Sequence, residues 1–291
     1  MEESDWDRLV RQLNAGACTP FLGAGACHGT LPTGTELARH WAERDNYPFS
    51  DRESLPRVMQ FSASMVNDPV YLKELVVEYL RGHGRPSDGR PLEPHSFLAR
   101  LPIPIYVTTN YDDFMVHALR AVDKTPTTMI CRWYEDGTKW LARTAPEPEP
   151  SAQAPIVFHL HGSATQPESI VLTEQDYVDF LINLSADQSA DDQRVIPTSI
   201  LPAFTNRPLL FIGYSLQDWT FRVIFQGLQR TISHGQRRRH ISVQLPEPHN
   251  HDDRERVMGF LNRSLEDWNI SVYWGTTEMF LAELSTRLDL S

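Results

Sequence analysis

The sequence has few cysteines and no long apolar run. Its 291 residues include only Cys18, Cys27 and Cys131, whose spacing makes neither a disulfide framework nor a CxxC zinc half-site. We therefore expect a reducing compartment and no structural zinc. The N-terminus lacks the basic start and apolar stretch of a secretion signal, and no apolar run is long enough to span a bilayer. These absences predict a cytoplasmic protein that does not bind membranes.

Positive charge is also scarce. There are 27 lysines and arginines against 38 aspartates and glutamates, which gives a net charge of −11. An acidic surface repels nucleic acid unless a local basic patch overrides it. The one basic run, Arg237 to Arg239 followed by His240, is too short to neutralise many phosphates. We therefore expect no direct binding of nucleic acid.

What the sequence does contain is a repeated unit of short apolar strand, polar turn and helix. The predicted strands cover residues 20–22, 103–108, 156–160, 208–212, 240–245 and 270–274. Helical spacing of apolar residues follows at about 114–119, 217–230, 254–268 and from 277. Alternation of this kind predicts an α/β fold with a mostly parallel sheet and helices on both faces.

Two segments interrupt this alternation. The first is a small helical module at about 36–95, whose helical spacing runs to residue 79 and then gives way to a loop rich in Pro and Gly. The second is a variable connector at about 123–155 that ends in a Pro-rich, acidic stretch. Before them, Ser4 is the expected N-cap of a helix that runs to about Leu13. The amino-acid sequence itself shows no internal repeat, and we expect one domain over residues 1–291.

Small and polar residues stand at the ends of four predicted strands, where ligands bind in parallel sheets. At the first strand end, Gly23, Ala24 and Gly25 form either a tight structural turn or a backbone cradle for a phosphate. The stretch lacks the full dinucleotide-binding fingerprint, because no third glycine opens a helix at the required offset. The residues by themselves leave both interpretations open.

The second and third strand ends carry Asn110, Asp112 and His161. Asn110 and Asp112 can cap the next helix, but the run TTNYDD offers more polar groups than a cap needs. His161 is either a hydrogen-bonded core residue or a general base, whereas His159 on the preceding strand is interpreted as structural.

The fourth strand end reads Gly213, Tyr214 and Ser215, followed by Asp218. These residues either contact a nucleotide or turn the chain and cap a helix. A separate loop contains acidic residues and histidines, which are residue types that bind metals. A loop does not fix the positions of these side chains, so we do not expect a metal site there. Its residues are His249, His251, Asp252 and Asp253.

Taken in order, these strand ends resemble the bacterial sirtuin-like NAD-hydrolase family, divergent relatives of sirtuin deacylases found in antiphage defence. The resemblance rests on GAGA at 23–26, TTNYDDFMVHAL at 108–119, VFHLHGS at 157–163 and LLFIGYSLQDW at 209–219. It covers residues 19 to 245 and implies a single sirtuin-like, Rossmann-like domain.

The resemblance also implies roles for individual residues. Gly23, Ala24 and Gly25 would approach the NAD pyrophosphate, and the turn of Gly213, Tyr214 and Ser215 would contact the adenosine half. Asn110 would orient the attacking water or the nicotinamide ribose, and Asp112 would contact the nicotinamide amide. His161 would act as the general base. NAD is then the substrate, and no metal is expected.

Three features depart from deacylating sirtuins. The segment between the asparagine and histidine motifs holds only Cys131 in place of two CxxC pairs, and the stretch CHGTLPTGTELA after the glycine turn contains no arginine. Gln244 stands where sirtuins place an asparagine for the adenine ribose. These departures argue against an acyl-lysine substrate and favour water as the acceptor.

We therefore expect an NAD hydrolase that forms nicotinamide and ADP-ribose and depletes cellular NAD during abortive infection. The resemblance further implies a homo-oligomer and a separately encoded partner or sensor, such as an ATPase or an Argonaute-type protein. The alternative from another class is an NAD- or ADP-ribose-binding regulatory module without turnover. A protein deacylase or ADP-ribosyltransferase is the third possibility, which the missing zinc ribbon disfavours.

Overall fold

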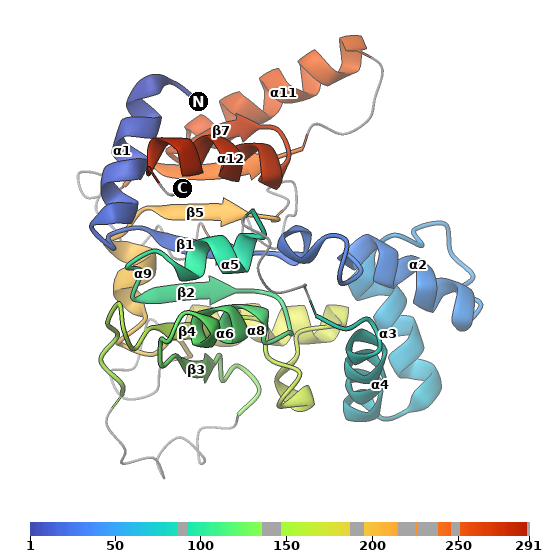
Figure 1. The fold of residues 1–291 in the computed structure, drawn as a ribbon. Helices are drawn as coiled ribbons and strands as arrows, with labels where there is room; N and C mark the ends of the chain where they lie inside the picture. The colour runs from blue at the N-terminus through green and yellow to red at the C-terminus, as the bar shows by residue number, and fades with distance from the viewer. Residues whose placement is uncertain are drawn as a thin grey trace.

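The computed structural model describes residues 1–85, 92–135, 147–186, 195–214, 225, 238–245 and 251–289. The sequence folds into a central sheet flanked by helices, with a helical module beyond the carboxyl ends of the strands (Figure 1). Ser215, Asp218, His249 and most of the helix predicted at 217–230 lie outside these residues. No helix in the described ranges is long and apolar enough to cross a membrane.

The sheet has seven parallel strands in the order β3-β4-β2-β1-β5-β6-β7. The strands are β1 (Thr19–Leu22), β2 (Ile105–Thr108), β3 (Thr127–Ile130), β4 (Ile156–His159), β5 (Leu209–Ile212), β6 (His240–Gln244) and β7 (Ile270–Trp274). In the centre, Phe21 of β1 pairs with Val107 of β2 on one side and with Phe211 of β5 on the other. The chain thus extends the sheet outward from β1 in both directions, and the crevice beyond the carboxyl ends at such a switch point is where ligands bind.

Two apolar cores lie on the two faces of the sheet. One face is covered by α1 (Glu3–Asn14), α5 (Pro94–Ala99), α6 (Phe114–Ala121) and α12 (Thr277–Arg287). The other is covered by α8 (Glu174–Ala186), α9 (Leu201–Thr205) and α11 (His251–Glu266). Side chains alternate between the cores, because Tyr106 belongs to the first and its neighbours Ile105 and Val107 to the second. Burial on both faces explains why the strands are apolar throughout.

The helical module consists of α2 (Gly34–Arg44), α3 (Leu55–Val66) and α4 (Pro69–Arg81). It lies beyond the carboxyl ends of the strands (Figure 1) and has its own core around Trp41, Met59 and Val76. Ile170 and Leu172, which follow the 3-10 helix η2 (Pro167–Ser169), join this core. The module therefore lies over the carboxyl ends of the strands, where ligands are expected.

The structure confirms the predicted α/β fold and its parallel sheet, with two corrections to element assignments. The first helix begins at Glu3 rather than after Ser4, because Glu2 and Asp5 form a reciprocal capping box at its N-terminus. Strand β3 falls inside the segment predicted as a connector. Its residues Thr127 and Thr128 are exposed, as an edge strand permits, so the apolar pattern that marks the other strands is missing.

Candidate functional site

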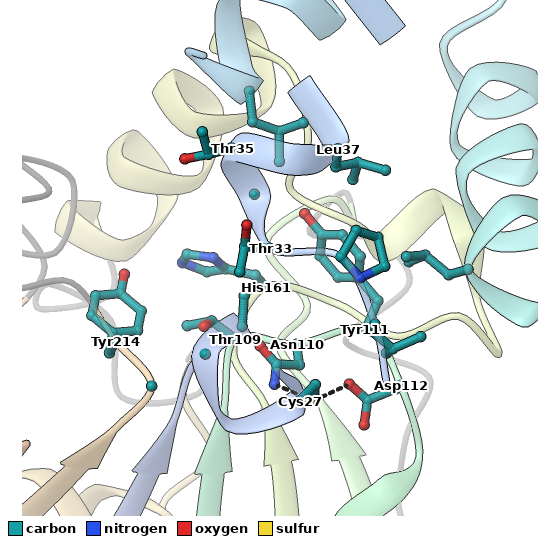
Figure 2. A pocket seen from close by; sticks show the side chains of 18 of the residues that line it. Cys27, Thr33, Thr35, Leu37, Thr109, Asn110, Tyr111, Asp112, His161 and Tyr214 are labelled. Carbon is teal, nitrogen blue, oxygen red and sulfur yellow. Dashed lines mark hydrogen bonds between the residues drawn. The ribbon is translucent and has the colours of Figure 1, made fainter. Parts of the chain in front are cut away.

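A cavity of about 630 Å³ opens at the carboxyl ends of β1, β2 and β5, below the helical module (Figure 2). Its walls come from the turn after β1, the start of α2, the segment after β2, and the ends of β5 and β6. The predicted site residues on its wall are Ala24, Gly25, Asn110, Asp112, His161, Gly213 and Tyr214. The cavity is large enough for a small-molecule ligand.

The glycines of the first turn pack against the turn after β5. A Cβ atom on Gly23 would lie 2.6 Å from the carbonyl oxygen of Gly213, and one on Gly213 would lie 2.0 Å from the backbone nitrogen of Ala26. Gly213 also has a φ of +68°, which residues other than glycine rarely adopt. A hydrogen bond of 2.8 Å from Gly25 N–H to the Gly213 carbonyl joins the turns. Close packing of two backbones thus accounts for these glycines, and binding of a phosphate stays a prediction.

Asn110 is held in one orientation. Its side-chain nitrogen donates to the carbonyl oxygen of Gly23 at 3.0 Å and to Sγ of Cys27 at 3.3 Å. Its backbone N–H is held by Oγ1 of Thr108 at 3.0 Å. Since both amide protons have partners, Oδ1 is the group presented to the cavity, and Figure 2 shows it directed away from Cys27. The site therefore offers a fixed hydrogen-bond acceptor to a hydroxyl or a water.

Asp112 caps a helix and also lines the cavity, and its contact with a ligand stays a prediction. Its Oδ1 accepts a 2.9 Å hydrogen bond from the backbone N–H of Phe114 at the start of α6. Its Oδ2 accepts from the thiol of Cys27 at 3.4 Å on the cavity wall. The neighbouring Asp113 instead forms an exposed ion pair of 2.7 Å with Arg85.

His161 lies just beyond β4 and is buried against the rings of Tyr177 and Phe180. Its Nε2 has no hydrogen-bond partner among the described residues. Burial lowers the pKa of His161 to about 3, so the imidazole is neutral at physiological pH. A neutral imidazole can accept a proton, although burial makes the protonated form costly.

His159 does not line the cavity but supports it. It is buried in β4, and its Nδ1 lies 3.2 Å from the backbone carbonyl oxygen of Asn110. Burial lowers the pKa of His159. This position agrees with the structural role that the sequence predicted for it.

The described residues include only part of the predicted contact with the adenosine half of NAD. The backbone carbonyl of Tyr214 accepts a 2.7 Å hydrogen bond from Nε2 of Gln244, which also lines the cavity. The ring of Tyr214 meets Phe21 edge to face, with centroids 5.4 Å apart. Ser215, the third residue of this predicted contact, lies outside the described residues.

Sequence reasoning missed a group of polar side chains under the cavity. Cys27 Sγ lies 4.0 Å from Nε2 of His95, whose Nδ1 lies 2.6 Å from Oε1 of Glu93. Burial alone would raise the pKa of Glu93, but the hydrogen bond and charge of His95 lower it to about 2. Only the Glu-Pro-His start of α5 marks these residues in the sequence, and nothing there places them beside Cys27, 68 positions away.

Comparisons with known proteins agree with this arrangement. The family model described as SIR2-like domain matches residues 104–273. A protein named NAD(+) hydrolase ThsA from Acinetobacter baumannii (strain 532279) is 24% identical over 216 residues, which cover 73% of this chain and 39% of that protein. A protein of the same name from Bacillus cereus (strain MSX-D12) is 26% identical over 155 residues, covering 53% and 28%.

The chain thus spans about two fifths or less of the length of these relatives. The family match nevertheless covers more than half of the chain and includes the strands that carry Asn110, His161 and Gly213. Together with the parallel sheet and the cavity at its switch point, it confirms the family resemblance of the motifs. The chain belongs to the SIR2-like domain family.

Proposed function

We propose that this chain hydrolyses NAD to nicotinamide and ADP-ribose in the cavity at the carboxyl ends of β1, β2 and β5. The observation that carries the proposal is that two residues line the same cavity: Asn110, whose Oδ1 is left as a fixed acceptor, and His161, whose Nε2 has no hydrogen-bond partner among the described residues. The two relatives described above bear the name NAD(+) hydrolase, which supports the same reaction here.

The chemistry suits these groups. Breaking the bond between ribose and nicotinamide expels a neutral leaving group and leaves positive charge on the ribose ring, as in other glycoside cleavages. The protein then has to orient a water, accept its proton and stabilise the charge. Asn110 Oδ1 would orient the water or a ribose hydroxyl, and His161 would accept the proton. Asp112 would contact the nicotinamide amide.

The rest of NAD would lie along the two turns. The backbone of Gly23, Ala24 and Gly25 would approach the pyrophosphate, and Gly213 and Tyr214, with Ser215, would contact the adenosine half. The negative charge of a bound pyrophosphate would raise the pKa of His161 from its low value and make the imidazole a stronger base.

One observation favours the second candidate, a module that binds NAD or ADP-ribose without turnover. A histidine with a pKa of about 3 is a weak base, which suits binding better than proton abstraction. The two candidates differ in a single product, because only the hydrolase releases nicotinamide.

The experiment is to incubate the purified protein with NAD, alone and with an acetylated peptide, and to separate the products by chromatography. We expect equal amounts of nicotinamide and ADP-ribose, with no transfer of the acetyl group. NAD binding without nicotinamide release would establish the binding module instead, and peptide-dependent release would establish a deacylase.

By resemblance to the family, we extend the proposal to biological role. The chain would act as an NAD-depleting effector of antiphage defence, as a homo-oligomer controlled by a separately encoded partner or sensor of the ATPase or Argonaute type. Its residues 1–291 would form one domain into which the helical module is inserted. Growth of cells that express the chain, followed together with their NAD content, tests the effector role.

A further inference from the structure

Three potential metal ligands meet under the cavity: Cys27 at the end of the 3-10 helix η1 (Ala24–Cys27), His95 in α5 and Asp112 after β2. The Cys27 Sγ lies 3.4 Å from Oδ2 of Asp112 and 4.0 Å from Nε2 of His95, and all three ligand atoms lie within 4.8 Å of one another. Cys27 and His95 are buried, whereas Asp112 is partly exposed. Three chemically different ligands from distant parts of the chain thus share one small volume.

These distances are close to those of a zinc site. Zinc bonds of about 2.3 Å to sulfur and about 2.0–2.2 Å to nitrogen or oxygen, in tetrahedral geometry, place neighbouring ligand atoms about 3.3–3.6 Å apart. The pair of Cys27 and Asp112 is already at this separation. The Cys27–His95 pair is about half an ångström wider than this, and the His95–Asp112 pair lies within 4.8 Å, so His95 would have to move toward both other ligands.

The environment of His95 supplies the second observation. Its Nδ1 faces Oε1 of the Glu93 carboxylate at 2.6 Å, and the backbone N–H of Ser96 holds the other carboxylate oxygen at 2.7 Å. This contact engages Nδ1 as the donor and turns Nε2 toward the Cys27 sulfur, where it can serve as a metal ligand. Metal-binding histidines characteristically donate a hydrogen bond from their second ring nitrogen to a carboxylate in this way.

The charge of the cluster also suits a cation. Glu93 and Asp112 flank Cys27 and His95, and neither carboxylate forms an ion pair with a lysine or arginine within the described part of the chain. A divalent ion would offset both charges. Cys27 and Asp112 line the cavity, so the ion could enter from it and the thiol proton could leave through it.

We propose that Cys27, His95 and Asp112 form a binding site for a thiophilic divalent cation, represented by Zn²⁺, and that its occupancy inhibits NAD hydrolysis. The fourth ligand position faces the cavity and would hold a water. Bound metal would withdraw the Cys27 sulfur from the Asn110 amide and Asp112 from the substrate. The inhibitory part rests on the function proposed above, and the binding part does not.

The test for binding is titration of the reduced, chelator-treated protein with Co²⁺, followed by absorption. We expect a thiolate-to-cobalt charge-transfer band and the visible bands of a tetrahedral ion, both abolished by excess Zn²⁺. Cys27→Ser should remove the charge-transfer band, and His95→Ala should weaken binding at least tenfold. Glu93→Gln keeps all three ligands and should weaken binding about 10- to 100-fold.

His28→Ala is the matched control, because His28 adjoins Cys27 in sequence but is exposed and outside the cluster. It should leave the spectrum and the affinity unchanged. Thermal unfolding of each variant without metal shows whether the substitution has disrupted the fold. Absence of a charge-transfer band in the folded wild type, or a band that survives Cys27→Ser, would overturn the site.

A second arm measures nicotinamide release with increasing Zn²⁺. We expect inhibition at the concentrations that displace Co²⁺, and a shift of at least tenfold toward higher zinc in Glu93→Gln. Full activity with zinc bound would refute the inhibition and leave the site intact. Metal binding by a protein that never releases nicotinamide would instead refute the proposed function alone.

Discussion

Sγ of Cys27 accepts a 3.3 Å hydrogen bond from the side-chain nitrogen of Asn110, and this contact determines which end of the Asn110 amide faces the cavity. The second amide proton goes to the Gly23 carbonyl at 3.0 Å. The turn after β1 therefore orients the group that follows β2. This dependence of one strand end on its neighbour leads to the first prediction.

Cys27→Ala should lower the kcat for nicotinamide release by about tenfold, because the loss of a hydrogen bond of about 1 kcal/mol or more lets the Asn110 amide rotate. KM should change much less, since most of the proposed contacts to NAD are unaffected. Cys27→Ser keeps a hydrogen-bond acceptor and should recover most of the lost kcat. Steady-state kinetics of wild type and the two variants provide the measurement. A Cys27→Ala variant with the kcat of wild type would show that the thiol does not orient Asn110.

Gly213→Ala should destabilise the protein by about 1–3 kcal/mol through its positive φ alone, and by more because the new Cβ would lie 2.0 Å from the backbone nitrogen of Ala26. Gly259 in α11 has open space around the position of a Cβ, so Gly259→Ala should stabilise by about 0.5–1 kcal/mol. Urea unfolding of both variants measures the difference. Equal stability of the two would contradict the close packing of the turns.

Acid should destabilise the fold through His240. Its Nδ1 accepts a 2.9 Å hydrogen bond from the backbone N–H of Leu209, and burial lowers its pKa from 6.5 to about 4. Since the unfolded chain binds this proton more readily, the stabilising contribution is complete above pH 6.5 and falls as the pH drops toward 4. The shift corresponds to roughly 3 kcal/mol over this window.

The measurement is the free energy of unfolding of wild type and His240→Gln between pH 4 and 7. Glutamine can still accept the Leu209 hydrogen bond but does not titrate, so the variant should show a shallower dependence on pH. His159 and His161 are buried with lowered pKa values in both proteins, and their contribution cancels in the difference. An unchanged slope would exclude His240 as a source of acid sensitivity.

The sheet was largely predictable because parallel strands are buried on both faces and read as continuous apolar runs. Phe158 and Phe211 stand in such runs, and both are fully buried. Strand β3 escaped prediction because Thr127 lies at the edge of the sheet, where exposure removes the apolar pattern.

The candidate site was predictable in its strand ends but not in its supports. Asn110 and His161 follow strands and reach the cavity by the general geometry of parallel sheets. The positions of Cys27, His95 and Glu93 depend instead on how α5 packs beside η1, which is a long-range contact that no local pattern encodes.

The central claim is that Asn110 and His161 together catalyse hydrolysis of NAD in this cavity. The most direct measurement is the rate of nicotinamide release by wild type, Asn110→Ala and His161→Ala, with Asp113→Asn as an exposed control beside the site. We predict losses of about 10²- to 10⁴-fold for His161→Ala, a loss of at least tenfold for Asn110→Ala, and little change for the control. Release at the wild-type rate by folded Asn110→Ala and His161→Ala variants would contradict the account.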